Sequence, residues 1–165
     1  MNKEELEKEI AKTKEQLDKL QKALESKEYE RWRPQYTEKY WYVTAQGGVN
    51  CYNFVRDHKD YELYDAFNCF QTKEQAEIEA EKILVRRMLE DIARRLNKNK
   101  TLNWKSQCQH KYSIYFDYRE DKIDTYPTTV PYKEQGAVYC LEQNFKDVAI
   151  QEIGEERLIR YLKDE

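Results

Sequence analysis

Cysteine and histidine are the residues of this chain best suited to bind a metal or to act as a nucleophile. Cys108 and His110 lie two positions apart, and Cys51 or Cys69 could complete a zinc site with them. Structural zinc sites usually contain closely spaced cysteine pairs, however, and the chain has no C-x-x-C motif. A Cys108 nucleophile activated by His58 is the second alternative. We expect neither, because the spacing favours reduced, mostly buried thiols and surface histidines, with no metal and no cofactor.

The remaining polar residues form no catalytic motif that the sequence shows. The chain lacks a glycine-rich phosphate loop, a G-x-S-x-G turn and an H-E-x-x-H pair. Its carboxylates are numerous, but none stands in an apolar stretch that would tune its acidity. We therefore expect a protein that acts by binding rather than an enzyme.

Basic residues concentrate in one stretch. Between Arg86 and Lys111 there are eight basic and two acidic residues, a net charge of +6 in a chain whose net charge is -3. Arginines seven or eight positions apart recur after about two helical turns, so one flank of a helix presents them together. Such a flank suits phosphate or an acidic partner, and the alternative is a solvated face paired with nearby carboxylates. The candidate binding residues are Arg86, Arg87, Arg94, Arg95, Lys98 and Lys100.

Aromatic side chains gather beside arginine in two segments, residues 31–42 and 112–119. Nucleic-acid bases stack on such rings in nucleotide and single-strand sites, but rings also supply the thin core of a small sheet. Side chains alternate along a strand, so Trp41 faces opposite to Tyr40 and Tyr42, and we expect at least one of these sides to be core. The candidate binding residues here are Arg31, Trp32, Arg33 and Trp41.

Residues 2–28 predict an amphipathic helix, because their apolar residues recur at the steps of three and four that define heptads, with Thr13 filling one gap. This narrow seam favours a coiled coil that joins two copies in parallel. A helix folded back on its own domain and a solvated arm are the alternatives. The expected dimerisation residues are Leu6, Ile10, Leu17, Leu20 and Leu24.

The sequence after residue 30 predicts two successive segments, each with strands followed by a helix. The first half predicts a hairpin around Gly47-Gly48, a third strand over residues 61–70, and a helix that Thr72 caps and that ends near Asn97. The second half predicts strands over residues 112–118, 122–126 and 136–141, and helices over residues 143–153 and 155–162.

Trp32 precedes Trp104 by 72 residues, and the same spacing relates Lys39-Tyr40 to Lys111-Tyr112. We interpret the pattern as a tandem duplication of a ββ(β)α unit. The expected fold class is α+β. Its domains are an N-terminal coiled-coil helix (1–30), a first unit (31–98), and a second unit with a C-terminal helix (99–165).

The composition narrows the classes of protein that fit. The 165 residues are 39% hydrophobic and 37% charged, and they include 14 tyrosines. No run of 18 apolar residues exists, and no apolar signal-peptide core follows Met1. We expect a cytoplasmic protein with no membrane contact. The small net charge argues against both a DNA mimic and a nonspecific polycation.

Three segments resemble a known group of proteins. They are Arg31-Trp32-Arg33-Pro34 with the aromatic strand that follows, the stretch from Asn68 to Glu77, and the ending Ile153-Gly154-Glu155-Glu156-Arg157-Leu158. Together they look like the small accessory proteins of phages and prophages of Gram-positive bacteria. The resemblance implies no catalytic residues. It implies a non-enzymatic protein that acts on host defence or host regulation by binding, within the host bacterial cytoplasm.

Three functions fit these observations. The leading hypothesis is a phage-derived protein that inhibits a host antiviral system by occupying a defence protein, in the manner of an anti-CRISPR protein. The first alternative is a sponge that sequesters a cyclic nucleotide signal, with arginines on its phosphates and aromatic rings on its bases. The second is a regulator that binds nucleic acid through the basic stretch, with strong salt dependence. We expect a homodimer in each case.

Overall fold

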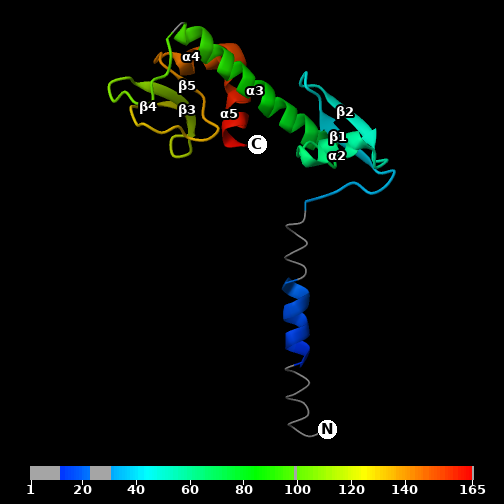
Figure 1. Cartoon of the computed structure of the whole chain (residues 1–165). Coiled ribbons are helices and arrows are strands. Elements are labelled where there is room, and N and C mark those ends of the chain that lie inside the picture. Colours follow the sequence, from blue (N-terminus) through cyan, green and yellow to red (C-terminus); the bar gives the residue numbers. More distant parts are fainter. Residues whose placement is uncertain (1–11, 23–30, 99, 165) are drawn as a thin grey trace. The chain divides into compact units, whose positions relative to one another are not determined.

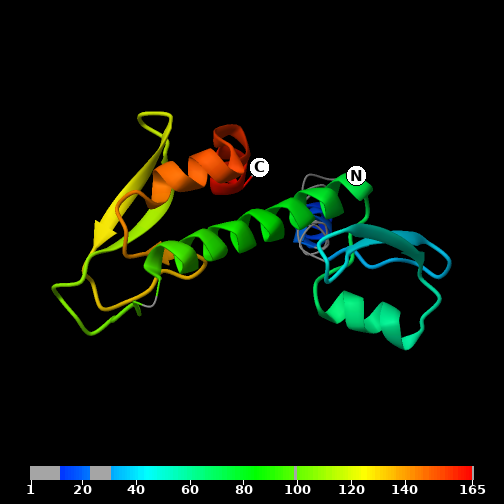
Figure 2. The same cartoon turned by 90° about the horizontal axis from the view of Figure 1, so that it is seen from above.

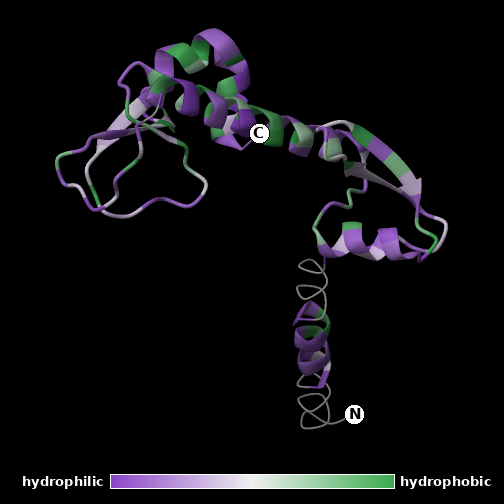
Figure 3. Cartoon of the chain, turned by 45° about the horizontal axis from the view of Figure 1, so that its top comes forward, coloured by the Kyte–Doolittle hydropathy of each residue, from purple (hydrophilic) through white to green (hydrophobic). Residues whose placement is uncertain are grey.

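The computed structural model describes residues 12–22, 31–98 and 100–164, and the chain divides into two units, residues 1–35 and 36–165 (Figure 1). In the first unit residues 12–22 are helical and mostly hydrophilic (Figure 3). Leu17 and Leu20 of the predicted seam are 57% and 71% exposed. Leu6, Ile10 and Leu24 lie outside the described residues, so the coiled coil stays a prediction.

The second unit begins with the predicted hairpin. Strands β1 (Lys39–Val43) and β2 (Val49–Asn53) pair antiparallel, with Trp41 opposite Cys51. Gly47 takes a φ of 87° in the turn, a conformation that glycine adopts without the steric cost of a Cβ atom. Tyr40 is fully buried, as the alternation along β1 predicts for one of its sides.

The predicted third strand over residues 61–70 is wrong. Helix α2 (His58–Asp65) occupies the first half of this segment, because Asp57 and Asp60 form a reciprocal capping box at the start of the helix. The β-propensity of the tyrosines in this segment misled the prediction, since local capping fixes the backbone here. Only Phe70 keeps a strand-like role, forming an isolated antiparallel bridge with Trp41.

Helix α3 (Lys73–Asn97) follows the prediction closely. Its N-cap Thr72 accepts a hydrogen bond from the backbone of Gln75, whose side chain accepts one from the Thr72 backbone. Lys98 ends the helix with a φ of 52°. Leu84 of this helix is 43% exposed.

The second half of this unit contains strands β3 (Lys111–Asp117), β4 (Lys122–Thr128) and β5 (Tyr139–Cys140), paired in the order β4-β3-β5. Helices α4 (Phe145–Ile153) and α5 (Glu155–Lys163) follow, separated by Gly154 with a φ of 93°. Arg157 of α5 forms a two-pronged ion pair with Glu81, which fastens α5 to α3 and lowers the pKa of that carboxyl.

The two halves share a strand register. Trp41 bridges Phe70 in the first half, and Ser113 pairs with Tyr139 in the second. Residues 41 and 113 are 72 apart, the offset of the sequence repeat, and residues 70 and 139 are 69 apart, because the second half is three residues shorter between them. The match supports the duplication, which itself stays a prediction.

Helix α3 serves two cores. Its first half buries Ala76 and Ala80 and contacts β1 and β2, its second half contacts β5 and α4, and α5 pairs with it at Glu81 (Figure 2). Val85, Leu89 and Ile92 lie in the larger core, which also contains Phe116 and Phe145. The helix therefore links both sheets of this unit through buried side chains.

The described part of the chain is α+β, with two small antiparallel sheets, which confirms the expected fold class at that level. Among the described residues, no helix combines the length and the apolar character that crossing a bilayer requires.

Candidate binding site

The C-terminal half of α3 places several basic side chains beside the chain that follows it. Arg94 and Arg95 lie in the last helical turn, where cations interact favourably with the carbonyl end of the helix dipole. Lys98 then reverses the chain direction, and residues 100–104 run alongside the sheet edge at Tyr139. This local geometry brings helix, loop and strand together around one open depression.

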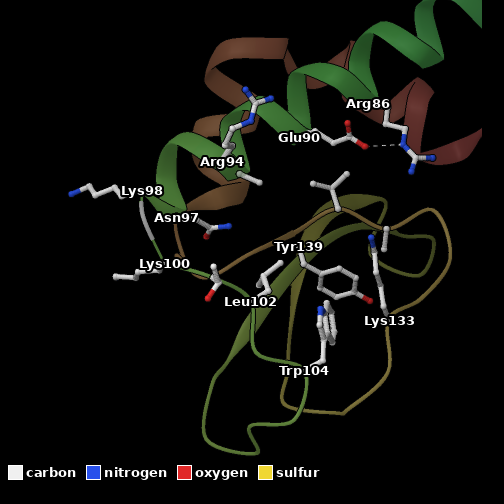
Figure 4. A pocket seen from close by; sticks show the side chains of 14 residues that line it. Arg86, Glu90, Arg94, Asn97, Lys98, Lys100, Leu102, Trp104, Lys133 and Tyr139 are labelled. Carbon is white, nitrogen blue, oxygen red and sulfur yellow. Dashed lines mark hydrogen bonds and ion pairs between the residues drawn. The ribbon is translucent and has the colours of Figure 1, made fainter.

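We call this depression the basic pocket (Figure 4). Its volume is about 450 Å³, within the range of small-molecule sites in proteins. Its charged lining comprises five basic residues and one acidic residue. Its lining includes Arg86, Glu90, Arg94, Asn97, Lys98, Lys100, Leu102, Trp104, Lys133 and Tyr139.

The floor of the pocket is aromatic and apolar. The ring centres of Trp104 and Tyr139 are 5.0 Å apart and the rings are nearly perpendicular, with Leu102 beside them in Figure 4. Lys111 approaches Trp104 to 5.2 Å from the ring centre, and its side chain is fully buried. Its ammonium group donates a hydrogen bond to the Gln109 carbonyl at 3.0 Å. Trp104 is thus held between a buried cation and a tyrosine ring.

The rim of the pocket is basic, and carboxylates neutralise only part of it. Arg86 pairs with Glu90 at 3.1 Å, and Arg94 pairs with Asp91 at 3.4 Å. Lys100 pairs with Glu142 at 2.8 Å, which lowers the pKa of that carboxyl.

Lys98 and Lys133 have no carboxylate within 4.0 Å among the described residues. In Figure 4 these two lysines lie at opposite sides of the pocket, and the Lys98 side chain extends away from it.

Asn97 contributes a polar group from the end of α3. Its Oδ1 accepts hydrogen bonds from the backbone of Leu141, at 2.7 Å, and from Cys140 Sγ, at 3.3 Å. These bonds fix the orientation of the amide and leave Nδ2 pointing toward the pocket in Figure 4. Cys140 is itself buried, and burial raises the pKa of its thiol.

The structure brings only part of the predicted basic flank together. Arg86, Arg94, Lys98 and Lys100 line the basic pocket, as a shared flank requires. Arg95 instead pairs with Asp91 and with Glu152 of α4.

Arg87 lies elsewhere too. It donates a hydrogen bond to the Ala45 carbonyl at 3.3 Å and lines a second, largely apolar groove with Phe67, Phe70 and Ile83. A single flank for all four arginines is therefore wrong. Adjacent helical positions point about 100° apart, so the chain sends Arg86 and Arg87 to different surfaces.

The predicted aromatic site residue Trp41 does not line the basic pocket. Trp41 is half-buried, with Lys39 at 5.8 Å from its ring centre and Phe70 bridged to its backbone. Arg31, Trp32 and Arg33 belong to the first unit, where Arg33 is exposed and the other two are half-buried.

The sequence did not indicate six of the ten named pocket residues: Glu90, Asn97, Leu102, Trp104, Lys133 and Tyr139. They come from three separate segments, and only the repeat offset marks Tyr139, as the counterpart of Phe70. Trp104 stands 72 residues after Trp32, but this repeat spacing does not identify it as a ligand contact.

The thiols differ from expectation. Cys51 and Cys108 are exposed, Cys69 is half-buried and only Cys140 is buried, so the prediction of mostly buried thiols is wrong. Cys51 is exposed because β2 buries almost none of its side chains. Within the described residues, no group of three or more histidine, cysteine or acidic side chains could hold a metal ion.

Comparisons with the models of known protein families, with curated protein sequences and with solved structures find no match to this chain. The function is therefore argued from the basic pocket itself.

Proposed function

We propose that the protein is a non-enzymatic binding protein that captures an anionic partner at the basic pocket and thereby inhibits a host antiviral defence system. Binding is the part of this proposal that the geometry supports. The role in phage defence comes from the resemblance to phage and prophage accessory proteins.

The observation that carries the proposal is the lining of the pocket. Five basic residues face one carboxylate around a tryptophan, in a chain whose overall charge is slightly negative. Arginine and tryptophan are also the residues that contribute most to binding energy at interfaces. The positive rim concentrates anions and steers them toward the pocket at low salt.

The partner in the leading form of this proposal is an acidic surface of a defence protein. The exposed arginine and lysine side chains on the rim would meet its carboxylates, and Trp104 would fill a depression in the contact. A nucleotide signal of the defence system is the other anionic partner that such a pocket suits.

The test is phage survival in a host that carries an antiviral system, with and without the expressed protein. We expect wild-type protein to protect the phage and Arg94→Glu/Lys98→Glu to lose protection, because the reversal turns two rim cations into anions. Lys22→Glu/Arg119→Glu is the matched control, since it makes the same charge change at exposed residues that are not part of the pocket lining. Equal protection by both variants would contradict the proposal.

A further inference from the structure

We infer that the ligand of the basic pocket is a nucleotide, with its base against Trp104 and Leu102 and its phosphates on the rim cations. This inference rests on the proposed function in so far as that proposal makes the basic pocket the binding site. It goes further by naming the chemistry of the ligand, a nucleotide in place of the protein surface of the leading form.

The floor of the pocket favours a flat apolar group. Trp104 and Leu102 are half-buried, so part of each side chain remains accessible from the pocket. Tyr139 and Lys111 hold the Trp104 ring in place, which lowers the entropy lost when a second ring stacks on it. Stacking on an aromatic side chain tolerates any nucleobase, because every base has a π face.

Asn97 adds a hydrogen-bond donor beside the apolar floor of the pocket. Its Oδ1 is engaged by Leu141 and Cys140, whereas its Nδ2 donates to no described residue. A free amide N–H2 group can donate to a ring nitrogen or a carbonyl oxygen on the edge of a base. The pocket therefore combines a stacking surface with an oriented donor.

The rim supplies the phosphate contacts. Lys98 and Lys133 are not paired with carboxylates, so an incoming phosphate need not displace an existing ion pair to reach them. They lie at opposite sides of the pocket in Figure 4, as the two phosphates of a cyclic dinucleotide require, and Lys98, which extends away from the pocket there, must turn inward to contact such a ligand. Arg86 and Arg94 are paired at the surface, where such pairs are weak and exchange readily.

The observations favour a small nucleotide over a longer strand of nucleic acid. The pocket has a single partly exposed tryptophan, and its volume suits one small ligand. Beyond it, the β3–β4 sheet has mixed charge, because Lys122 and Lys146 pair with Asp124 there. The sheet therefore presents no continuous basic surface for a polynucleotide to follow.

The experiment is isothermal titration of the full chain with ADP, GDP, cyclic mononucleotides and cyclic dinucleotides. Adenosine, guanosine, pyrophosphate and a single-stranded RNA decamer are measured alongside them. We expect at least one nucleotide to bind at least about tenfold more tightly than its nucleoside and than pyrophosphate, because both the base and the phosphates contribute.

Two variants locate the binding. We expect Trp104→Leu to weaken binding about tenfold or more, because leucine keeps the apolar packing but removes the stacking ring. Lys98→Gln/Lys133→Gln changes only exposed side chains, so its fold is secure, and we expect it to weaken nucleotides but not nucleosides. Lys22→Gln/Arg119→Gln is the matched control and should bind like the wild type.

Three outcomes would overturn the inference: no binding of any nucleotide, pyrophosphate binding as tightly as the best nucleotide, or binding of the RNA decamer alone. The phage test separates the two proposals. If Arg94→Glu/Lys98→Glu loses protection but no nucleotide binds, this inference fails and the proposed function stands. If a nucleotide binds at the pocket but the reversal leaves protection intact, the proposed function fails and this inference stands.

Discussion

Tyr40 and Asp60 form a buried polar pair in the core beside the β1–β2 hairpin. Both side chains are fully buried, and the tyrosine hydroxyl donates to Asp60 Oδ1 at 2.8 Å. The other carboxylate oxygen accepts from the backbone of Val55 at 2.7 Å and of Asp57 at 3.2 Å. One aspartate thereby ties β1, the end of the hairpin and the start of α2 together. Burial, with the hydrogen bond to Asp60, raises the pKa of Tyr40 above its ordinary value.

We predict that Tyr40→Phe costs about 1–3 kcal/mol of stability at neutral pH, because Asp60 loses a buried donor. A raised pKa in the folded state gives stability that is complete below the unfolded pKa of about 10 and is lost as pH rises above it. The difference between wild type and variant should therefore shrink above about pH 10, by at most about 1.4 kcal/mol per pH unit. Urea unfolding between pH 7 and 11 measures it, with Tyr126→Phe as the exposed control.

Lys111 is a buried cation with no carboxylate partner within 4.0 Å among the described residues. A lone buried charge is costly, and one carbonyl and one aromatic ring replace only part of its hydration. We predict that Lys111→Met leaves stability unchanged or raises it by up to about 2 kcal/mol, since methionine keeps much of the packing. A loss of more than about 1 kcal/mol in urea unfolding would show that the cation contributes net stability.

At the scale of elements, the sequence specified most helices and strands because their signals are local. Alternating aromatic and β-branched residues predict β1, β3 and β4, and Thr72 with Gln75 predicts the start of α3. Helix α2 was missed because its signal, the Asp57–Asp60 capping box, stands beside tyrosines that favour strands. The basic pocket was found only in part, because tertiary structure brings Lys133 and Tyr139 to α3 from distant segments.

The long helix also shows a relation that its sequence alone did not suggest. Val85, Leu89 and Ile92 form the buried face of α3, and Thr13, Leu17 and Leu20 stand 72 residues earlier. The 72-residue offset that relates β1 to β3 thus also relates the N-terminal helix to α3, the helices that precede these strands. The N-terminal seam consequently has the same spacing as a helix face known to pack in this chain.

The N-cap of α3 gives a prediction at this scale. We expect Thr72→Ala to lower stability by about 1 kcal/mol, because the Gln75 backbone N–H loses its acceptor. Thermal or urea unfolding measures the change. Thr101→Ala, in an exposed loop, is the control and should stay within about 0.5 kcal/mol of wild type. An equal loss in both variants would argue against a specific contribution of the cap.

At the scale of the whole molecule, the open question is whether two copies associate through the N-terminal seam. Leu17 and Leu20 are large, exposed and apolar in the single chain. We predict that wild type is a dimer in light scattering coupled to size exclusion, and that Leu17→Asp/Leu20→Asp is a monomer. Lys12→Asp/Lys19→Asp, on exposed positions outside the seam, should remain dimeric. A monomeric wild type would contradict the coiled-coil prediction.

Helix α3 contributes side chains to both cores of the second unit, and this arrangement has a consequence for how the protein responds to a ligand. Melting of the helix removes part of the packing of both sheets, so the opening reactions that melt it are energetically linked. A ligand held at the C-terminal end of α3 stabilises the closed form and so suppresses the fluctuations that require the helix to melt. Amide protons of the β1–β2 hairpin should then exchange with deuterated solvent more slowly, although the ligand contacts none of them.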